Sequence, residues 1–347
     1  MKLAPVARAL AVRGARHVVV HTGQHYDPEM SEAFFRDLCL PRADYALDVG
    51  SGSHARQTAA IMERFEPLCE TVAPDVVLVY GDVNSTVAAA LVAAKLGITV
   101  GHVEAGLRSR DRTMPEELNR LVTDHLADVL FAPSRDAVEN LRGEGVSPEP
   151  IHFVGNVMID SLVVALPGAR ALEAPRRHGV ARGQYTVVTL HRPANVDDPA
   201  TLCELIGAIA QLGTEGPVLF PVHPRTRARL RTLGADAAGR DGVRLLEPLP
   251  YLEMLGLVAD AGLVITDSGG LQEETSWLGV PCVTVRPNTE RPITITHGTN
   301  RLVTFDELVP ATRKALEAPH GRAGTPPLWD GQAGPRIAEV ITRFIGE

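Results

Sequence analysis

Short apolar runs rich in valine and isoleucine alternate with longer amphipathic stretches along this chain. A continuous apolar run of about four to eight residues is typical of a parallel strand buried on both faces, and a longer amphipathic stretch is typical of a helix that covers such a sheet. The pattern therefore predicts an α/β protein in which helices connect parallel strands.

In the first half of the chain, the alternation predicts one doubly wound unit. Its strands are placed at Val18–Thr22, Val76–Tyr80, Thr99–Val103, Val129–Ala132 and Ile151–Val154. Its helices are placed at Glu29–Leu38, Ala55–Val72, Val83–Leu96, Glu116–Ala127 and Arg135–Glu144.

The alternation restarts in the second half, after a stretch rich in alanine, arginine, glycine and proline that ends at Gly183. Here the strands are placed at Thr186–Leu190, Val218–Pro221, Val243–Leu245, Leu263–Thr266 and Cys282–Val285. We therefore expect two Rossmann-like domains, at residues 1–164 and 165–330, and a terminal helix within 331–347 that packs back toward the first domain. Because ligands of open α/β sheets collect at the carboxyl ends of strands, the two domains are expected to face a central cleft.

Composition argues against several classes of partner. The 347 residues carry a formal net charge of −8 and a pI near 5.9, so no general basic surface is available for nucleic acid. No segment reaches the roughly 18 apolar residues that cross a bilayer, and the start at Met1 is too short for a secretory signal. We expect a cytoplasmic protein without a membrane partner.

Ser268, Gly269 and Gly270 follow a predicted strand and open a helix. Small residues let a phosphate approach the backbone, and the first amides of a helix have no intrahelical partner, so the segment predicts an anion site. Glu274, in the first helical turn, could reach sugar hydroxyls, and the planar guanidinium of Arg291 suits a diphosphate. The combination indicates a nucleoside diphosphate. Alternatively, Ser268 only caps the helix and the glycines only turn the chain.

Three acidic residues are candidates for proton transfer. Asp82 and Glu104 follow predicted strands, and Glu116 stands in the first turn of a predicted helix. Crowded carboxylates cannot all ionise easily, so such a cluster provides an acid or a base near neutral pH. Alternatively, Asp82 is a helix N-cap and Glu116 an exposed residue favoured by the helix dipole. Glu104 could likewise be the structural partner of Arg108 or Arg110.

Two histidine and arginine pairs follow strands of the second half, His191 with Arg192 and His223 with Arg225. An imidazole beside a guanidinium at the carboxyl edge of a sheet is suited to stabilising the charge of a departing diphosphate. The alternative for either histidine is a hydrogen bond to the backbone at the end of its strand.

Metal and dinucleotide chemistry fit the sequence less well. His102 and Glu104 have the spacing of a zinc deaminase motif, but no second cysteine follows Cys282 at the required position. Gly50–Ala55 has a dinucleotide-like glycine spacing, yet no apolar strand precedes it. We expect neither a metal nor a cofactor.

Eight motifs spread along the chain are specific in combination. They are His21–Asp27, Val79–Asp82, Gly101–Arg108, Pro115–Arg120, Leu190–Arg192, Pro221–Pro224, Thr266–Glu274 and Glu290–Pro292. With these motifs the chain resembles, nearly from end to end, the non-hydrolysing UDP-N-acetylglucosamine 2-epimerases, which have the two-domain glycosyltransferase-B architecture. The resemblance implies reversible conversion of UDP-N-acetylglucosamine to UDP-N-acetylmannosamine, by elimination of UDP and its return to a bound glycal.

The resemblance also implies roles for individual residues. The catalytic residues would be the carboxylates of Asp82, Glu104 and Glu116, with His191 assisting at the diphosphate. UDP would be bound by Lys2, Ser268, Gly269, Gly270, Glu274 and Arg291. A second, activating site for the substrate, which some bacterial members carry, matches Gln24, Arg56, Gln57, Glu116, Arg192 and His223.

The chain departs from the family pattern at its start. Family members begin with a strand and a Gly-x-Arg-Pro loop that have no counterpart before Lys2, so we expect the first strand of the N-terminal domain to be missing. Ala194 stands where the family usually has glutamate, and Asp27 stands where members with the second site often have glutamine.

Three other functions stay open, because a fold alone does not determine function. They are a glycosyltransferase that uses a UDP-sugar, a hydrolysing epimerase that accumulates UDP and free sugar, and a non-catalytic UDP-sugar-binding protein. In each case the partner is a UDP-sugar, and we expect a homodimer.

Overall fold

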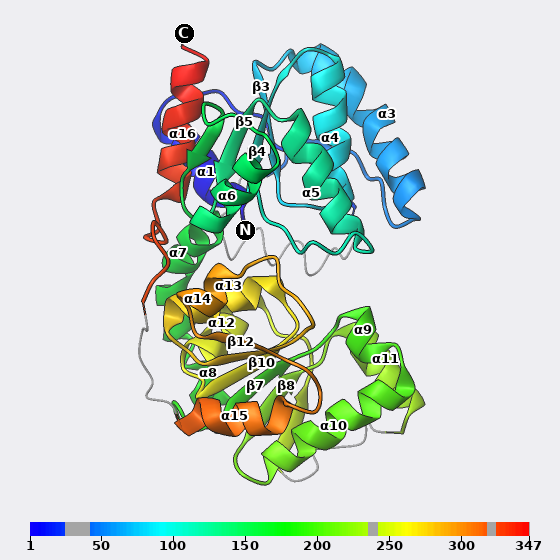
Figure 1. Cartoon of the computed structure of the whole chain (residues 1–347), viewed down its shortest axis with the longest axis vertical. Coiled ribbons are helices and arrows are strands. Elements are labelled where there is room, and N and C mark those ends of the chain that lie inside the picture. Colours follow the sequence, from blue (N-terminus) through cyan, green and yellow to red (C-terminus); the bar gives the residue numbers. More distant parts are fainter. Residues whose placement is uncertain (25–41, 235–241, 318–323, 347) are drawn as a thin grey trace. The chain divides into compact units, whose positions relative to one another are not determined.

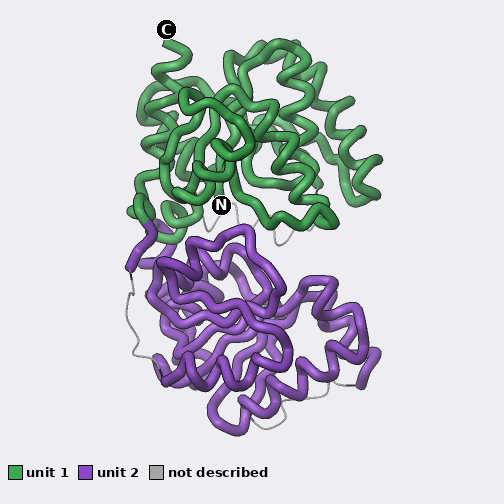
Figure 2. The backbone as a smooth tube through the Cα atoms, viewed as in Figure 1, with its two compact units in different colours: residues 1–163, 327–347 green, residues 164–326 purple. Residues whose placement is uncertain are grey.

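A computed structural model of the chain describes residues 1–24, 42–234, 242–317 and 324–346. The chain divides into two compact units (Figure 2). Unit 1 comprises Met1–Val163 and Pro327–Glu347, and unit 2 comprises Val164–Pro326. Each unit contains a parallel sheet covered by helices, which confirms the predicted α/β class. None of the helices in the described ranges combines the length and the hydrophobicity that a bilayer crossing requires.

The main sheet of unit 1 has four parallel strands in the order β3-β4-β5-β6. They are β3 (Val76–Tyr80), β4 (Thr99–Val103), β5 (Val129–Ala132) and β6 (Ile151–Phe153). Within the described residues, a separate parallel pair is formed by β1 (Val20–His21) and β2 (Tyr45–Ala46). The strands β3, β4 and β5 occupy the predicted residues, whereas β2 was not predicted because two exposed residues give no periodic signal.

The helices of unit 1 lie between and around these strands. They are α1 (Leu3–Val12), α3 (His54–Val72), α4 (Asn84–Lys95), α5 (Pro115–Leu126), α6 (Arg135–Gly143) and α16 (Ala333–Phe344), and α7 (Val157–Ala171) continues into unit 2. The helix predicted at Glu29–Leu38 lies outside the described residues. No helix was predicted at Val157–Ala171, yet α7 occupies these residues and contains Pro167 in its interior, where proline is usually disfavoured.

Helices cover both faces of the four-stranded sheet of unit 1, with α1 and α16 on one side and α3 and α4 on the other (Figure 1). Val77 and Val79 of β3 point into the core formed with α3 and α4. Leu78 and Tyr80 point into the core formed with α1 and α16. Because alternate side chains serve opposite cores, these strands are apolar at nearly every position.

In the described part of unit 2, the sheet has six parallel strands in the order β12-β11-β10-β7-β8-β9. They are β7 (Thr186–Thr189), β8 (Val218–Pro221), β9 (Val243–Leu246), β10 (Leu263–Thr266), β11 (Cys282–Val285) and β12 (Asn300–Val303). The edge strand β12 was not predicted, because it carries a buried asparagine and an exposed arginine in place of an apolar run. The other five lie within one residue of their predicted bounds.

Helices cover both faces of this sheet as well. They are α8 (Ala174–Arg177), α9 (Pro193–Val196), α10 (Pro199–Gly213), α11 (Pro224–Thr232), α12 (Tyr251–Ala259), α13 (Gly269–Leu278), α14 (Ile293–Thr296) and α15 (Leu308–Glu317). Val188 and Ile265 pack into a core with α10 and α15, while Val187 and Val264 pack into a core with α12. The loops that follow the carboxyl ends of these strands carry the polar candidate residues.

Candidate active site

Asp82 and Glu104 follow two neighbouring strands at the same edge of the sheet in unit 1. Tyr80, the last residue of β3, is in register with Val103, the last residue of β4. The Gly81 amide donates to the Val103 carbonyl at 3.0 Å, which continues the pairing beyond the strands. The backbone of Glu104 has a φ of 78°, a left-handed conformation that costs a non-glycine residue about 1–3 kcal/mol.

Asp82 is bound by a buried arginine. Its carboxylate forms an ion pair with Arg120 of α5, whose side chain is 2% exposed. Arg120 also contacts Glu117, with Nη2 2.5 Å from Oε2. Burial alone would raise the pKa of Glu117, but the amide of Ser109 and the guanidinium of Arg120 hold that pKa below its usual value. Asp82 is not the N-cap of α4, because that position belongs to Val83.

Glu104 forms an ion pair with Lys2, near the start of the chain. Arg108 and Arg110, which the sequence offered as structural partners, bind side chains of other residues. A methyl group added at Gly81 would lie 2.5 Å from Nζ of Lys2, so this ammonium also lies against the turn that precedes Asp82. The resemblance placed Lys2 at the nucleotide, and the structure places it beside the proposed acids.

Glu116 lines a cavity of about 230 Å³ in unit 1, together with Gln24 and Gln57. Gln57 Nε2 donates to the Gln24 carbonyl at 3.1 Å, and Gln24 Oε1 accepts from the Ser85 amide at 2.9 Å. Arg56 is the neighbour of Gln57 on α3 and is exposed. Three residues of the suggested second substrate site thus lie around one cavity.

The segment expected to bind an anion forms the start of α13 in unit 2. This helix begins at Gly269, and Ser268 is its N-cap residue. The Ser268 side chain makes no cap hydrogen bond, whereas the Ser268 amide donates to Thr266 Oγ1 at 2.9 Å. The interpretation of Ser268 as only a helix cap is therefore not supported. Amides at such a helix start attract anions.

Arg291 lies against the start of α13, since a methyl group added at Gly269 would be 2.7 Å from its Nη1. Its side chain is buried between two carboxylates. It forms an ion pair with Glu290, and its Nε lies 2.8 Å from Oε1 of Glu273. Burial alone would raise the pKa of Glu290, but Arg291 and Arg286 hold it well below its usual value. These charges fix the guanidinium beside the helix amides.

Glu274 is a buried acid within α13. Its Oε1 accepts a hydrogen bond from the hydroxyl of Tyr251 at 3.1 Å. Burial raises the pKa of Glu274 to about 7, and the neighbouring Glu273 acts in the same direction, while the hydrogen bond from Tyr251 opposes it. The Glu274 carboxyl therefore changes its charge near neutral pH.

His191 follows β7 and is oriented by Asp267, which follows β10. The strands are neighbours, and Nδ1 of His191 lies 3.0 Å from Oδ1 of Asp267. Asp267 also accepts the backbone amides of His191 and Arg192, at 3.0 and 2.9 Å, and the side-chain amide of Asn195 at 3.0 Å. Burial alone would raise the pKa of Asp267, but these donors hold it below its usual value.

His223 follows β8 and lies beside His191, with 5.5 Å between the ring centroids. Its Nδ1 accepts the amide of Arg225 at 3.2 Å, so the ring caps α11. Burial lowers the pKa of His223, and His191 acts in the same direction. The guanidinium of Arg225, which the sequence paired with this imidazole for binding a diphosphate, forms an ion pair with Asp197.

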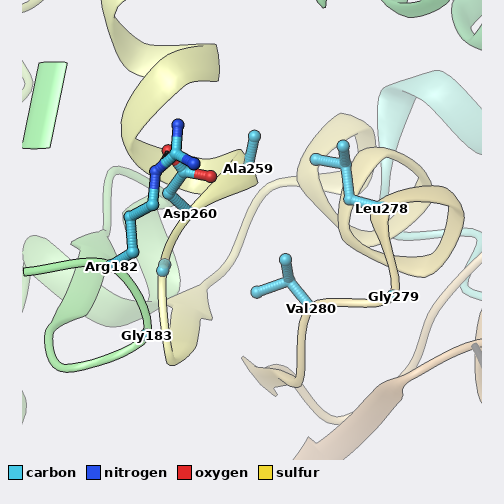
Figure 3. Close-up of a pocket in the computed structure, with 8 residues that line it drawn as sticks. Arg182, Gly183, Ala259, Asp260, Leu278, Gly279 and Val280 are labelled. Atoms are coloured by element: carbon cyan, nitrogen blue, oxygen red, sulfur yellow. Dashed lines mark ion pairs between the residues drawn. The ribbon is translucent and has the colours of Figure 1, made fainter. Parts of the chain in front are cut away.

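A larger cavity of about 460 Å³ in unit 2 contains none of the expected site residues (Figure 3). Gly183, Asp260 and Val280 line it, and these residues precede β7, β10 and β11. The cavity therefore lies at the amino edge of the sheet, opposite the edge that carries His191 and Ser268.

Sequence reasoning missed three residues that bind candidate site residues: Arg120 at Asp82, Asp267 at His191 and Tyr251 at Glu274. Asp267 carried a usable signal, because it directly follows β10, and Asp82 was identified from a similar position two residues after β3. Arg120 and Tyr251 are brought to their partners by tertiary packing, which has no counterpart in local sequence spacing.

The two α/β units, each built on a sheet of parallel strands, belong to the glycosyltransferase-B class of architecture. A family model described as UDP-N-acetylglucosamine 2-epimerase matches residues 8–342, and the chain belongs to that family. The UDP-N-acetylglucosamine 2-epimerase of Methanococcus maripaludis is 41% identical, over 98% of this chain and 94% of that protein. The UDP-2,3-diacetamido-2,3-dideoxy-D-glucuronate 2-epimerase of Pseudomonas aeruginosa is also 41% identical, over 94% of this chain and 91% of that protein.

Solved structures agree with this assignment. The crystal structure of the Methanocaldococcus jannaschii UDP-GlcNAc 2-epimerase in complex with UDP-GlcNAc and UDP has a TM-score of 0.91 and 40% identity. The match covers 99% of this chain and 96% of that chain. The chain therefore belongs to this epimerase family by sequence and shares its fold.

Proposed function

We propose that this protein interconverts UDP-N-acetylglucosamine and UDP-N-acetylmannosamine by inverting carbon 2 of the sugar. The observation that carries the proposal is the full-length match to the epimerase family, joined to two chemically suited edges: Asp82 and Glu104 in unit 1, and the start of α13 with His191 in unit 2. Neither a redox cofactor nor a metal is required by the proposed route.

In the proposal, unit 2 holds UDP. The amides of Gly269 and Gly270 bind the diphosphate, because amides at the start of a helix have no intrahelical partner, and the Ser268 hydroxyl, which makes no cap hydrogen bond, adds a further donor. The guanidinium of Arg291 contributes a charge beside them. Glu274 accepts the ribose hydroxyls and is positioned by Tyr251.

Unit 1 supplies the proton chemistry. The hydrogen on carbon 2 is barely acidic, so its removal must be coupled to departure of a leaving group. One carboxylate takes that proton while the bond between carbon 1 and UDP breaks, and its electron pair leaves on the diphosphate oxygen. The products are a bound glycal and UDP, with the new charge stabilised by α13, Arg291 and His191.

The return step regenerates a nucleotide sugar. UDP adds to carbon 1, and a second acid delivers a proton to the opposite face of carbon 2. Two acid–base groups on different faces of the sugar are required, and Asp82, Glu104 and Glu116 supply them in our proposal. Lys2 orients Glu104 through their ion pair.

A second substrate is a specific alternative within the same chemistry. The Pseudomonas aeruginosa relative named for a diacetamido glucuronate is as identical to this chain as the Methanococcus maripaludis relative named for UDP-N-acetylglucosamine. Both sugars carry an acetamido group at carbon 2. A direct comparison of kcat/KM for the two nucleotide sugars distinguishes them.

Proton NMR in deuterium oxide tests the proposed function. The protein with UDP-N-acetylglucosamine and no acceptor should form the manno epimer with deuterium at carbon 2. Epimer without deuterium contradicts elimination, accumulation of free sugar indicates a hydrolysing epimerase, and absence of exchange with either sugar contradicts epimerisation. Each of the substitutions Asp82→Asn, Glu104→Gln and Glu116→Gln should lower the exchange rate by orders of magnitude, while the circular dichroism spectrum stays unchanged.

Further parts of the proposal concern regulation and assembly. The residues that the resemblance assigns to an activating substrate site are Gln24, Arg56, Gln57 and Glu116 in unit 1 and Arg192 and His223 in unit 2. Sigmoidal rate curves that become hyperbolic in Gln57→Ala would support this. We also propose a cytoplasmic homodimer, for which light scattering should give twice the mass of 37.2 kDa.

A further inference from the structure

His102 is a fully buried residue of β4 whose two ring nitrogens both face oxygen atoms. Nδ1 lies 2.6 Å from Oδ1 of Asp124, and Nε2 lies 2.8 Å from the carbonyl oxygen of Gly81. The His102 ring points into the protein, between β4, α5 and the turn after β3.

Asp124 is surrounded by donors. In addition to His102, its Oδ2 lies 2.7 Å from Nη1 of Arg108 and accepts the amide of Gly106 at 3.0 Å. Burial alone would raise the pKa of Asp124, but His102 and Arg108 hold that pKa below its usual value. The carboxylate accepts from all three groups and has no proton to donate to the ring.

The Gly81 carbonyl likewise only accepts. A neutral imidazole has one donor nitrogen and one acceptor nitrogen, so it can satisfy only one of these two partners. An acceptor nitrogen facing a carbonyl oxygen at 2.8 Å would be repelled by it. Both contacts are satisfied when the ring carries a proton on each nitrogen.

We infer that His102 is a buried imidazolium that, together with Asp124, positions Asp82 relative to Glu104 for the reaction. This inference rests on the proposed function, because it assigns His102 to the acids of that reaction. His102 touches neither acid and is a positioning residue. Its role is to hold the two turns from which those acids project.

The two turns are held at opposite ends of the pair. His102 binds the carbonyl of Gly81, directly before Asp82, and Asp124 binds the amide of Gly106, two residues after Glu104. Gly81 has a φ of 69°, a left-handed conformation that favours glycine at the bound residue. A hydrogen-bonded pair of side chains therefore spans the turns after β3 and β4.

The surrounding charges make a buried cation acceptable. Arg108 binds Glu144 through two contacts, Nε to Oε1 at 2.8 Å and Nη2 to Oε2 at 2.6 Å. The network thus contains two cations, His102 and Arg108, and two anions, Asp124 and Glu144. A buried ion pair is tolerated when its charges and hydrogen bonds are matched in this way.

Two substitutions separate the two contacts of the ring. The amide of His102→Asn can take the place of Nδ1 and keep the bond to Asp124, while the bond to Gly81 is lost. The longer His102→Gln can take the place of Nε2 and keep the bond to Gly81. We expect kcat to fall about 100-fold in His102→Asn, because misplacement of a reacting group by about 1 Å has this effect. We expect a fall of less than about tenfold in His102→Gln, with KM nearly unchanged in both.

Asp160→Asn is a matched control in the same unit. Asp160 is a buried carboxylate that accepts the amides of Ala333 and Gly334 at the start of α16, far in sequence from the proposed acids. It should lower the urea midpoint without changing kcat. If His102 were only structural, both His102 variants would behave like this control, with a lower urea midpoint and an unchanged kcat.

Nitrogen-15 NMR of the histidine side chains tests the charge without substrate. Both ring nitrogens of His102 should carry a proton at pH 8, and a nitrogen without a proton would overturn the inference. Equal losses of kcat in His102→Asn and His102→Gln, or no loss in either, would overturn the positioning role. A wild-type chain that exchanges no deuterium into either sugar would overturn the proposed function instead, whatever the NMR result.

Discussion

Asp267 orients the imidazole of His191 from a fully buried position, with 3.0 Å between Oδ1 and Nδ1. The same carboxylate also accepts a hydrogen bond from the backbone amide of His191, so it holds both the backbone and the ring of this residue. A carboxylate at Nδ1 places the proton there and directs Nε2 away from the core. In the proposed reaction, this sets which nitrogen meets the diphosphate.

Asp267→Asn should lower kcat by about 10²–10³, because the leaving diphosphate loses a preorganised donor. Deuterium exchange into carbon 2 measures the rate. In a His191→Ala background the same substitution should have little further effect, since both changes then remove one function. Independent, multiplied losses would show that Asp267 acts through another group.

Arg120→Met should lower the free energy of unfolding by about 3–5 kcal/mol, because it leaves Glu117 buried without its cation. Urea denaturation followed by circular dichroism measures this. Arg343→Met is the control, since the Arg343 and Glu339 pair on α16 is exposed and should contribute less than about 1 kcal/mol. Similar changes in both variants would contradict a structural role for the buried pair.

UDP should bind more weakly as the pH falls below about 7. The pKa of Glu274 is raised to about 7 by burial, so the carboxyl is protonated below that pH and must release a proton to accept two ribose hydroxyls. The expected change in Kd is about tenfold per pH unit. Calorimetric titrations of the wild type and of Glu274→Gln separate this effect from titration of UDP itself, and equal pH slopes would contradict it.

Gly269→Ala should weaken UDP binding about tenfold or more, which corresponds to loss of one charge-assisted hydrogen bond. The added methyl group would lie 2.7 Å from Nη1 of Arg291 and would displace that guanidinium. Gly207→Ala is the matched control in α10, because no atom lies within 4 Å of the added methyl group. Unchanged UDP affinity in Gly269→Ala would show that Arg291 does not contribute to the anion site.

The strands were predictable because parallel strands buried on both faces are apolar at nearly every position. Val76–Tyr80 and Leu263–Thr266 begin and end at the predicted residues. Periodicity failed where polar residues are buried, as at Asn300 in β12, and where the element is too short, as in β2.

The placement of candidate residues at strand ends was also predictable, because topology brings the carboxyl ends of parallel strands to one edge. Their partners were not. Arg120 reaches Asp82 across 38 positions of sequence, and Lys2, in place of the alternative partners Arg108 and Arg110, pairs with Glu104. Such pairings depend on how α5 and α1 pack against the sheet, and no local pattern encodes that.

The left-handed backbone of Glu104 has a consequence for the balance between folding and activity. Only glycine adopts this conformation without penalty, so Glu104→Gly should unfold at a higher urea concentration than Glu104→Ala, although both lack the carboxylate. The chain thus has glutamate at a position where the backbone conformation favours glycine. Glycine would relieve the conformational penalty, but it would abolish the proposed chemistry. Selection for thermal stability alone would favour glycine at position 104 and would thereby remove one of the proposed acids.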